Sequence, residues 1–364
     1  MRILLLSAYD ADSHVYWREG LVAHLSEYQW TVLKLPGRYF SWRMRGNSLS
    51  WAFSEYETLS QPYDLVIATS MTDLSSLRGF VPSLANTPTL VYFHENQFAY
   101  PSSGKEFKSV EPCILNLYTA LAADYCLFNS EYNRKTMLEG AAALLAKLPD
   151  QVPLGLIERI RKRSSVLSVP LCDDSFLPST AINGEFTITW NHRWEYDKNP
   201  QLLLDSMRLL SDLDVDFTLN IVGQQFRKIP KQFDLLNALL ADRIGHWGYM
   251  PSRLAYQQLL QQSDVVLSTA LHDYQGIAVL EGAAAGAFPV VPDRLAYTEL
   301  FPEGCRYSGE DEAETLALLL KQLIDYKKAG RGLKCVDVSH LNWTVMADHY
   351  RRIIQQVVLG NVVN

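Results

Sequence analysis

Short apolar runs, each followed by polar residues and then by a helical pattern, recur along the whole chain. Residues 2–7, 63–69 and 89–93 carry such runs in the first half (RILLLS, YDLVIAT and TLVYF). Residues 186–190 and 217–222 start the same rhythm again in the second half (FTITW and FTLNIV). Continuous apolar strands of this length are typical of parallel sheets that helices cover on both faces. The pattern therefore predicts an α/β fold.

The length of the chain, 364 residues, suits two such sheets in two domains. Residues 171–184 contain prolines, polar residues and a glycine, and we interpret them as a linker. We therefore predict two Rossmann-like domains, 1–170 and 185–342, that face each other across a cleft. Residues 343–364 begin with an amphipathic helical pattern, and we expect this helix to pack back on the first domain.

Composition and charge narrow the class of protein further. The chain is 48% hydrophobic with a net charge of −7, so nucleic acid could bind only through local basic patches. The first apolar run is too short for a signal peptide or a membrane span. The five cysteines have no Cys-x-x-Cys spacing, which favours reduced thiols in a cytoplasmic protein. Several Asp-x-Asp triplets lack supporting ligands, and we therefore predict no metal site.

The stretch 272–291 (HDYQGIAVLEGAAAGAFPVV) reads as a glycine turn, a short helix and a buried strand. Gly276 allows the backbone to approach a ligand, and the first turn of the helix offers unpaired N–H groups to an anion. Glu281 can accept hydrogen bonds from sugar hydroxyls. The stretch therefore predicts a site for a phosphorylated sugar nucleotide, with Asp273 at its start. An ordinary strand–helix–strand unit with an incidental glycine is the alternative.

Two cations five positions apart, Arg193 and Lys198, lie between a predicted strand and a helix that starts near Pro200. A guanidinium can hold a diphosphate through two hydrogen bonds, and an ammonium adds a point charge. Placement on an ordinary surface is the alternative. The second anion-binding pattern at 272–291 favours binding.

Polar residues also follow the strands of the first half. Ser13 and His14 come after the first strand, and His94-Glu95-Asn96-Gln97 comes directly after the strand at 89–93. Such side chains are costly to bury unless they are hydrogen-bonded or line a cleft. His94 can contact the transferred group or relay a proton. A satisfied core histidine at His94, and a helix-capping or surface histidine at His14, are the alternatives.

Residues 37–47 (GRYFSWRMRGN), which we expect to form a loop, interleave basic and aromatic side chains. Arg38, Arg43 and Arg45 can pair with phosphates, and Trp42 can stack on an unpaired base. This segment is the best nucleic-acid candidate in the chain. A solvated loop whose aromatic rings pack over the core is the alternative.

The spacing of these residues resembles that of retaining glycosyltransferases of the two-domain GT-B type, in the GT4-like group. Arg193-x4-Lys198 matches that group's basic pair, and Asp273-x7-Glu281 matches its Glu-x7-Glu motif with an acid one methylene shorter at the first position. A narrower likeness covers nearly the whole chain. The strings YFHENQFAYP, LPGRYFSWRMR, LFNSEYN, WNHRWEYDKNP, HWGYMPS and HDYQGIAVLEG resemble the tRNA-queuosine mannosyltransferase family.

This resemblance implies a GT-B fold and a hexosyltransferase that moves mannose from GDP-mannose to queuosine in a tRNA anticodon. It implies no metal, no other cofactor, no membrane and no protein partner. Front-face attack, with the leaving phosphate taking the acceptor proton, is the mechanism we expect, because no enzymic nucleophile is evident. The early loop departs from the family, which has glycines before Ser-His where this chain has Ala11 and Asp12.

The residue patterns and the resemblance together give the predicted site. The reaction is assigned to His94, Arg193, Lys198 and Asp273. The donor is assigned to Arg193, Lys198, Gly223, Trp247, Gly248, Tyr249, Gln275, Gly276, Ile277 and Glu281. The acceptor is assigned to Ser13, His14, Arg38, Trp42, Arg43, Arg45, Glu95 and Asn96.

Three other functions fit the same pattern. The first is a GT-B enzyme that acts with another sugar nucleotide on a lipid, a glycan or a small molecule. The second is a sugar-nucleotide epimerase, which would release free sugar without an acceptor. The third is a non-catalytic tRNA-binding protein, against which Arg193, Lys198 and Glu281 together argue.

Overall fold

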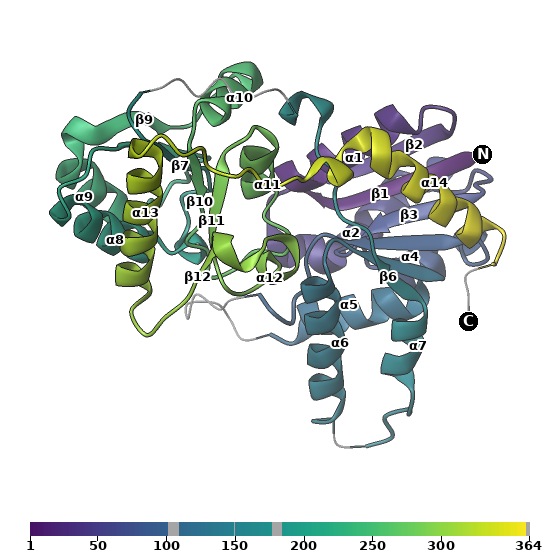
Figure 1. Ribbon diagram of the computed structural model, residues 1–364. Helices are drawn as coiled ribbons and strands as arrows, with labels where there is room; N and C mark the ends of the chain where they lie inside the picture. Colours follow the sequence, from purple (N-terminus) through teal and green to yellow (C-terminus); the bar gives the residue numbers. More distant parts are fainter. Residues whose placement is uncertain (101–108, 149, 177–183, 362–364) are drawn as a thin grey trace. The chain divides into compact units, whose positions relative to one another are not determined.

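The computed structural model describes residues 1–100, 109–148, 150–176 and 184–361. The chain divides into two compact units (Figure 1). Unit 1 comprises Met1–Pro170 together with Trp343–Asn364, and unit 2 comprises Leu171–Asn342. Each unit is built on one six-stranded sheet whose neighbouring strands are parallel.

The sheet of unit 1 has the strand order β2-β1-β3-β4-β5-β6. The residues of β3 and β4 are buried throughout, because helices in the connections cover the sheet. Burying one such apolar side chain stabilises the fold by about 1.5–3 kcal/mol. The strands of unit 1 are β1 (Arg2–Asp10), β2 (Gln29–Pro36), β3 (Leu65–Thr69), β4 (Thr89–Phe93), β5 (Tyr125–Phe128) and β6 (Ser164–Val166).

The sheet of unit 2 has the order β12-β11-β10-β7-β8-β9. Its core gathers Trp190, Phe217, Leu219 and Phe233, each wholly buried. The strands of unit 2 are β7 (Thr187–Trp190), β8 (Thr218–Val222), β9 (Ile244–Gly248), β10 (Val265–Leu267), β11 (Phe288–Pro292) and β12 (Arg306–Tyr307).

In each sheet the direction of strand addition reverses once. In unit 1 the chain places β2 on one side of β1 and β3 on the other, and in unit 2 it places β8 on one side of β7 and β10 on the other. Loops at the carboxyl ends of such strand pairs diverge to opposite faces, and this is where ligands bind in open α/β sheets. The residues that follow β1, β3 and β4 in unit 1, and β7 and β10 in unit 2, are therefore placed for function.

The helices of both units connect these strands. In unit 1 they are α1 (Asp12–His24), α2 (Phe40–Ser54), α3 (Tyr56–Leu59), α4 (Leu74–Phe80), α5 (Glu111–Ala122), α6 (Glu131–Leu145), α7 (Leu156–Lys162) and α14 (Trp343–Val358). In unit 2 they are α8 (Pro200–Asp212), α9 (Gln232–Leu239), α10 (Arg253–Gln261), α11 (Ile277–Ala284), α12 (Tyr297–Leu300) and α13 (Glu312–Lys328).

The last helix, α14, packs on α1 of unit 1 (Figure 1). Trp17 Nε1 donates a hydrogen bond to the Tyr350 hydroxyl at 3.0 Å, and that hydroxyl donates to the Ser168 carbonyl at 3.0 Å. The Trp343 indole lies against Gly20, where an added Cβ would come within 2.4 Å of Nε1. The close approach of the two helices therefore depends on the absence of a side chain at Gly20.

The expected linker lies only partly within the described residues, because 177–183 fall outside them. Its first part belongs to unit 2, where Leu171 forms a parallel bridge with Asn342 and residues 173–175 form a single 3-10 turn. No helix among the described residues is both long and apolar enough to cross a bilayer.

We expect Gly20→Ala to destabilise unit 1 by about 1–3 kcal/mol, because the new methyl group overlaps the buried Trp343 indole. Gly79→Ala in α4 is the matched control. A Cβ at Gly79 meets no atom within 4 Å, so the change should be neutral or stabilise by about 0.5–1 kcal/mol through helix propensity. Urea unfolding of both variants measures the difference, and equal stabilities would contradict the packing argument.

Candidate active site

The two predicted cations of unit 2 lie in the loop after β7 and meet at a buried carboxylate. Lys198 Nζ is 3.5 Å from Asp197 Oδ2, and Arg193 Nη2 is 3.7 Å from the same oxygen. Arg193 also pairs with Glu195 at 2.6 Å and keeps a half-exposed side chain, whereas Lys198 is buried. Asn199 follows in the left-handed region and caps α8 by accepting from the Leu202 N–H at 3.3 Å. This turn holds both cations beside the start of α8.

Asp273 lies in the loop after β10 and ties that loop to the cations. Its Oδ2 accepts hydrogen bonds from Lys198 Nζ and the Tyr297 hydroxyl, each at 3.2 Å, and its Oδ1 accepts from the Gly276 N–H at 2.8 Å. Burial by itself raises the pKa of Asp273, but Lys198, the neighbouring histidines and the Gly276 N–H outweigh burial and lower the pKa below its ordinary value. Asp273 is therefore ionised at neutral pH and builds the turn before α11.

Two glycines, Gly276 and Gly223, stand where a side chain has no room, and a third, Gly248, has a positive φ that disfavours one. Gly276 has φ = 71°, and an added Cβ would lie 2.5 Å from the Tyr297 ring. Gly223 has φ = 152°, and its Cβ would lie 1.8 Å from the His192 carbonyl oxygen. Gly248 ends β9 with φ = 107° and accepts a hydrogen bond from the Gly223 N–H at 3.2 Å. The predicted donor glycines therefore let loops at the carboxyl edge of the sheet approach each other closely.

Glu281 lies on α11 and is buried in a polar cluster of its own. Its Oε1 accepts from Arg253 Nη1 at 2.7 Å, and its Oε2 accepts from the Tyr256 hydroxyl at 3.1 Å. Burial raises the pKa of Glu281, and Arg253 and Tyr256 only partly offset that rise. Asn191 joins the cluster by donating to the Tyr256 hydroxyl at 2.8 Å and to the Ala278 carbonyl at 2.7 Å.

Two further histidines lie beside Lys198. Burial and the Lys198 charge lower the pKa of His192 to about 3 and that of His272 to about 4. Both rings are therefore neutral at physiological pH. Unit 2 thus concentrates positive charge on Arg193 and Lys198 rather than spreading it over the histidines.

The other predicted donor residues are dispersed around these loops. Trp247, in β9, packs edge-on against Trp194 with ring centroids 4.9 Å apart. Tyr249 is 63% exposed, Gln275 is buried, and Ile277 is the first residue of α11. Trp247 is thus mainly a packing residue, whereas Tyr249 is open to solvent.

In unit 1, His14 and the residues after β4 come together. His14 Nε2 is 3.1 Å from Glu95 Oε2, and Ser70 Oγ donates to Glu95 Oε1 at 3.0 Å. The ring centroids of His14 and His94 are 4.3 Å apart. Ser13, by contrast, is exposed in the first turn of α1. The loops after β1, β3 and β4 therefore build one polar cluster at the carboxyl edge of the sheet.

Asn96 turns away from this cluster and braces the loop that carries it. Its amide nitrogen donates to Asn133 Oδ1 at 2.8 Å and to Thr136 Oγ1 at 2.9 Å, and its Oδ1 accepts from the Phe98 N–H at 2.9 Å. The side chain is fully buried. Both the amide nitrogen and the amide oxygen of Asn96 are thus hydrogen-bonded to protein groups, which indicates a structural role.

Residues 37–47 are not a loop throughout, and that prediction is wrong from Phe40 onward. Tyr39 takes a left-handed conformation with φ = 56°, and α2 begins at Phe40. Met44, Asn47 and Ser48 are buried at helical spacing, so packing selects the helix. Phe40, Trp42 and Arg45 are exposed on this helix, whereas Arg43 is half-buried.

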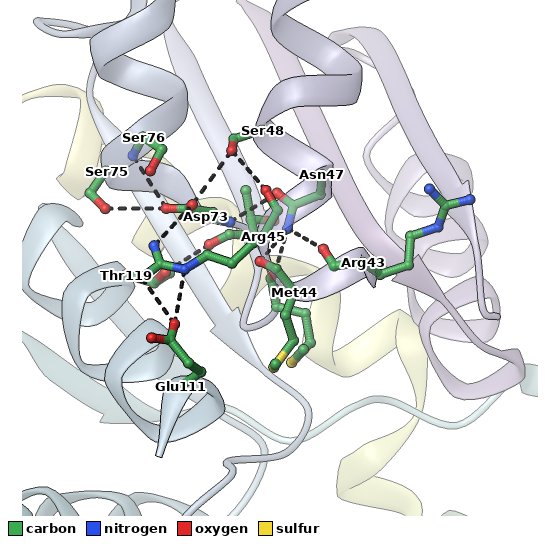
Figure 2. Close-up of polar contacts among 12 residues, drawn as sticks. Arg43, Met44, Arg45, Asn47, Ser48, Asp73, Ser75, Ser76, Glu111 and Thr119 are labelled. Carbon is green, nitrogen blue, oxygen red and sulfur yellow. Dashed lines mark hydrogen bonds and ion pairs between the residues drawn. The ribbon is translucent and has the colours of Figure 1, made fainter. Parts of the chain in front are cut away.

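Arg45 points into a polar network that fastens α2 to its neighbours (Figure 2). Its guanidinium lies 3.4 Å from Asp73 Oδ2 and 3.1 Å from Glu111 Oε2. Asn47 Oδ1 accepts from the Asp73 N–H at 2.9 Å, and Ser48 Oγ donates to Asp73 Oδ2 at 3.4 Å. Asp73 also caps α4, so Arg45 helps join α2, α4 and α5.

Arg43 leaves α2 in another direction, away from the Asp73 network (Figure 2). Trp42 is 53% exposed, and a Cβ at Gly46 would come within 2.4 Å of its indole. The Arg38 guanidinium stacks over the Tyr39 ring at 5.6 Å from its centroid. Arg38 and Trp42 are therefore exposed, and Arg43 is half-buried with its Nε covered.

Two family models together match almost all of the chain. Residues 2–171 match the family described as tRNA-queuosine alpha-mannosyltransferase N-terminal, and residues 175–331 match glycosyl transferases group 1. The tRNA-queuosine alpha-mannosyltransferase of Drosophila melanogaster is 31% identical over 316 residues, which cover 84% of this chain and 83% of that protein. The chain belongs to the tRNA-queuosine alpha-mannosyltransferase family. It is a glycosyltransferase.

Solved structures of other proteins with this fold resemble nearly the whole chain. The structure of Anabaena Alr3699/HepE in complex with UDP superposes with a TM-score of 0.69 at 13% sequence identity. The match covers 98% of this chain and 100% of the HepE chain. Sucrose-phosphate synthase from Thermosynechococcus elongatus is 13% identical over 99% of this chain and 100% of that one, with a TM-score of 0.74. At this identity the likeness speaks for the fold alone, and it confirms the predicted GT-B fold.

Within this mannosyltransferase-family fold, the structure assembles two groups of predicted residues. Unit 2 brings together Arg193, Lys198, Asp273 and Gly276, and unit 1 brings together His14, His94 and Glu95. Sequence analysis missed the partners that hold these groups in place. They are Ser70, Asn191, Asp197, Arg253, Tyr256 and Tyr297. Of these, Asp197 lies inside the Arg-x4-Lys pair, and Ser70 and Asn191 directly follow predicted strands, so these three had a local signal.

We expect Gly276→Ala to cost more stability than Gly330→Ala, although both glycines are left-handed with φ of 71° and 73°. A Cβ at Gly330 meets no atom within 4 Å, so that variant bears only the backbone strain of about 1–2 kcal/mol. Gly276→Ala adds the overlap with Tyr297, worth about 1–3 kcal/mol more. Urea unfolding compares the two variants, and a nucleotide-sugar titration should show weaker binding only for Gly276→Ala.

Proposed function

We propose that this enzyme transfers a mannosyl group from GDP-mannose to queuosine in the anticodon of tRNA, with retention of configuration. The observation that carries the proposal is family membership across both units, since the Drosophila relative bears the name of this activity. A cytoplasmic location follows from the proposed substrate, because the modification acts on tRNA.

The donor diphosphate would bind at Arg193 and Lys198, beside the start of α11. Both cations are paired internally with Glu195, Asp197 and Asp273, and phosphate oxygens would compete with these carboxylates. The N–H groups that follow Gly276 add the positive end of the α11 dipole. Negative charge that develops on the leaving diphosphate is thus stabilised where it appears, and the proposal needs no metal.

Glu281 is proposed to accept hydrogen bonds from the ribose hydroxyls. Each of its oxygens already accepts one hydrogen bond, from Arg253 or from Tyr256. A carboxylate has about four acceptor positions, so capacity for hydroxyl donors remains. Arg253 also contacts Asp174 at 3.3 Å and Ser175 Oγ at 3.1 Å. These contacts hold the guanidinium in place, and the guanidinium in turn orients the Glu281 carboxylate.

Asp273 is a poor candidate for an enzymic nucleophile. Its Oδ2 accepts from Lys198 and Tyr297 and its Oδ1 accepts from the Gly276 N–H, and these contacts lower its pKa, which makes it a weak nucleophile. We therefore propose front-face attack, in which the leaving phosphate takes the acceptor proton and Asp273 holds Lys198 and the turn in place. An oxocarbenium-like state would form at the sugar during transfer.

The acceptor RNA is proposed to contact the exposed side of α2 and the residues before it. Arg43 and Arg38 can pair with phosphates, and Trp42 offers a ring on which an unpaired base can stack. Arg45 is proposed to act as an anchor, because Asp73 and Glu111 already neutralise it. A lipid, glycan or small-molecule acceptor is the alternative, since the net charge of −7 gives RNA no general attraction.

The decisive experiment incubates the protein with queuosine-containing tRNA and a panel of sugar nucleotides, followed by mass analysis of the nucleosides. Addition of one hexose from GDP-mannose alone is the expected result. The same tRNA without queuosine is the control and should stay unmodified. Release of free sugar without an acceptor would favour the epimerase, and RNA binding without donor binding would favour the non-catalytic alternative.

We expect Arg193→Ala to lower kcat/KM by about 100-fold or more, because one diphosphate contact that strengthens in the transition state is lost. Lys198→Met, which keeps the apolar stem, should do the same. Arg208→Ala on α8 is the control, since that side chain is 54% exposed and its one ion pair within the described residues is with Asp205, at 3.8 Å. Turnover like that of the unaltered enzyme in Arg193→Ala would exclude this diphosphate site.

We expect Arg43→Ala to weaken tRNA binding and to reduce the slope of log K against log salt by about one, as loss of one phosphate contact requires. Arg45→Ala should leave the slope unchanged, because its charge already pairs with Asp73 and Glu111. Binding titrations at several salt concentrations distinguish the two. A slope change in Arg45→Ala alone would reverse the two assignments.

A further inference from the structure

The ring of His14 lies between two hydrogen-bond acceptors. Its Nδ1 is 2.5 Å from the Tyr9 carbonyl oxygen, and its Nε2 is 3.1 Å from Glu95 Oε2. The other carboxylate oxygen, Glu95 Oε1, accepts from Ser70 Oγ at 3.0 Å. A neutral imidazole carries a single N–H, so both contacts are satisfied only when His14 carries two. The geometry therefore favours a His14 imidazolium.

His94 lies next to this charge and is itself buried, with 6% of its surface exposed. Its ring centroid lies 4.3 Å from that of His14. The rings of Trp17 and Tyr92 pack against it, with centroid distances of 4.9 Å and 4.7 Å. Its Nε2 is buried and has no hydrogen-bond partner among the described residues. A second imidazolium at this distance would repel the first, so His94 is the neutral member of the pair.

The backbone that carries His94 is held independently of the ring. Asn129 Nδ2 donates to the His94 carbonyl at 2.8 Å, and Asn133 Nδ2 donates to the Phe93 carbonyl at 2.9 Å. A change in the protonation of His14 or His94 therefore leaves these backbone hydrogen bonds at Phe93 and His94 in place.

Within the described part of the chain, Glu95 is the anion that acts most strongly on the charge of His14. Asp10 lies near His14, but it forms an ion pair with Arg18 at 3.0 Å. Burial raises the pKa of both Tyr92 and Tyr350, which keeps these neighbours neutral. Burial lowers the pKa of His14, yet Glu95 and the other acceptors outweigh burial and raise it. Burial and the His14 charge both lower the pKa of His94.

We propose that Glu95 is a positioning residue of the transfer reaction: it holds His14 as an imidazolium and so keeps His94 neutral, with Nε2 free to meet a hydroxyl group. The hydroxyl belongs to the sugar or the acceptor, so this inference rests on the proposed function. A neutral imidazole nitrogen can accept a hydrogen bond from a hydroxyl group or donate one to it, and an imidazolium can only donate. The charge of His14 thus extends the pH range over which His94 keeps both abilities.

The direct test is an NMR titration of the imidazole nitrogens in the full chain, without substrates. In the unaltered protein we expect His14 to titrate above its ordinary pKa and His94 to stay neutral well below it. In Glu95→Gln, the pKa of His14 should fall by about one unit or more, because the carboxylate that stabilises its charge is gone. The pKa of His94 should rise, because a neutral His14 no longer repels a proton on His94. An unchanged His14 titration would overturn the proposal, whatever the transfer assay shows.

The pH dependence of transfer supplies the second readout. The acid limb of kcat/KM should move to higher pH in Glu95→Gln, in step with the NMR shift of His94, while the rate at higher pH changes less. Glu27→Gln, which removes the carboxylate that pairs with Arg351 at 2.7 Å, is the control and should leave the profile unchanged. Coupled titrations with an unaltered acid limb would show that the charge pair exists but does not serve transfer. Absence of transfer in the unaltered protein would contradict the proposed function instead.

Discussion

The contact between Lys198 and Asp273 holds unit 2 together at the carboxyl edge of its sheet. It joins the loop after β7 to the loop after β10, at the point where the strand order of the sheet reverses. A buried ion pair of this kind is costly to desolvate and is stable only when its remaining hydrogen-bonding positions are filled. Here the Gly276 N–H, the Tyr297 hydroxyl and the His272 carbonyl fill them. This contact fixes the turn before α11 and the position of Lys198.

The two units stabilise their buried polar groups in different ways. Unit 2 uses charge, in the clusters around Asp273 and Glu281. Unit 1 uses a chain of asparagines, with Asn96, Asn129 and Asn133 bonded to one another or to the backbone behind β4. Amides give direction without net charge, and charge enters at that edge through separate pairs, Glu95 with His14 and Asp10 with Arg18.

Much of the architecture was predictable from the sequence because it depends on local patterns. Buried parallel strands are apolar along their whole length, and the residues that follow them lie at the functional edge, as Arg193 and His94 do. Contacts between distant segments left no such signal. Nothing near Glu281 in the sequence pointed to Arg253 or Tyr256, and the helix at Phe40–Ser54 was obscured by aromatic residues that usually mark loops in basic segments. Arg43 and Arg45 look equivalent in the sequence, and only the fold turns one of them toward Asp73.

The return of α14 to unit 1 has a consequence for the order of folding during synthesis. Unit 2 is an insertion, since Leu171–Asn342 lies between the two segments of unit 1. The ribosome completes unit 2 before it completes unit 1, whose α1 surface stays uncovered until Trp343 and Tyr350 emerge. The nascent chain therefore carries a finished unit 2 and an unfinished unit 1, with Trp17 and the apolar face of α1 exposed to chaperones in the interval.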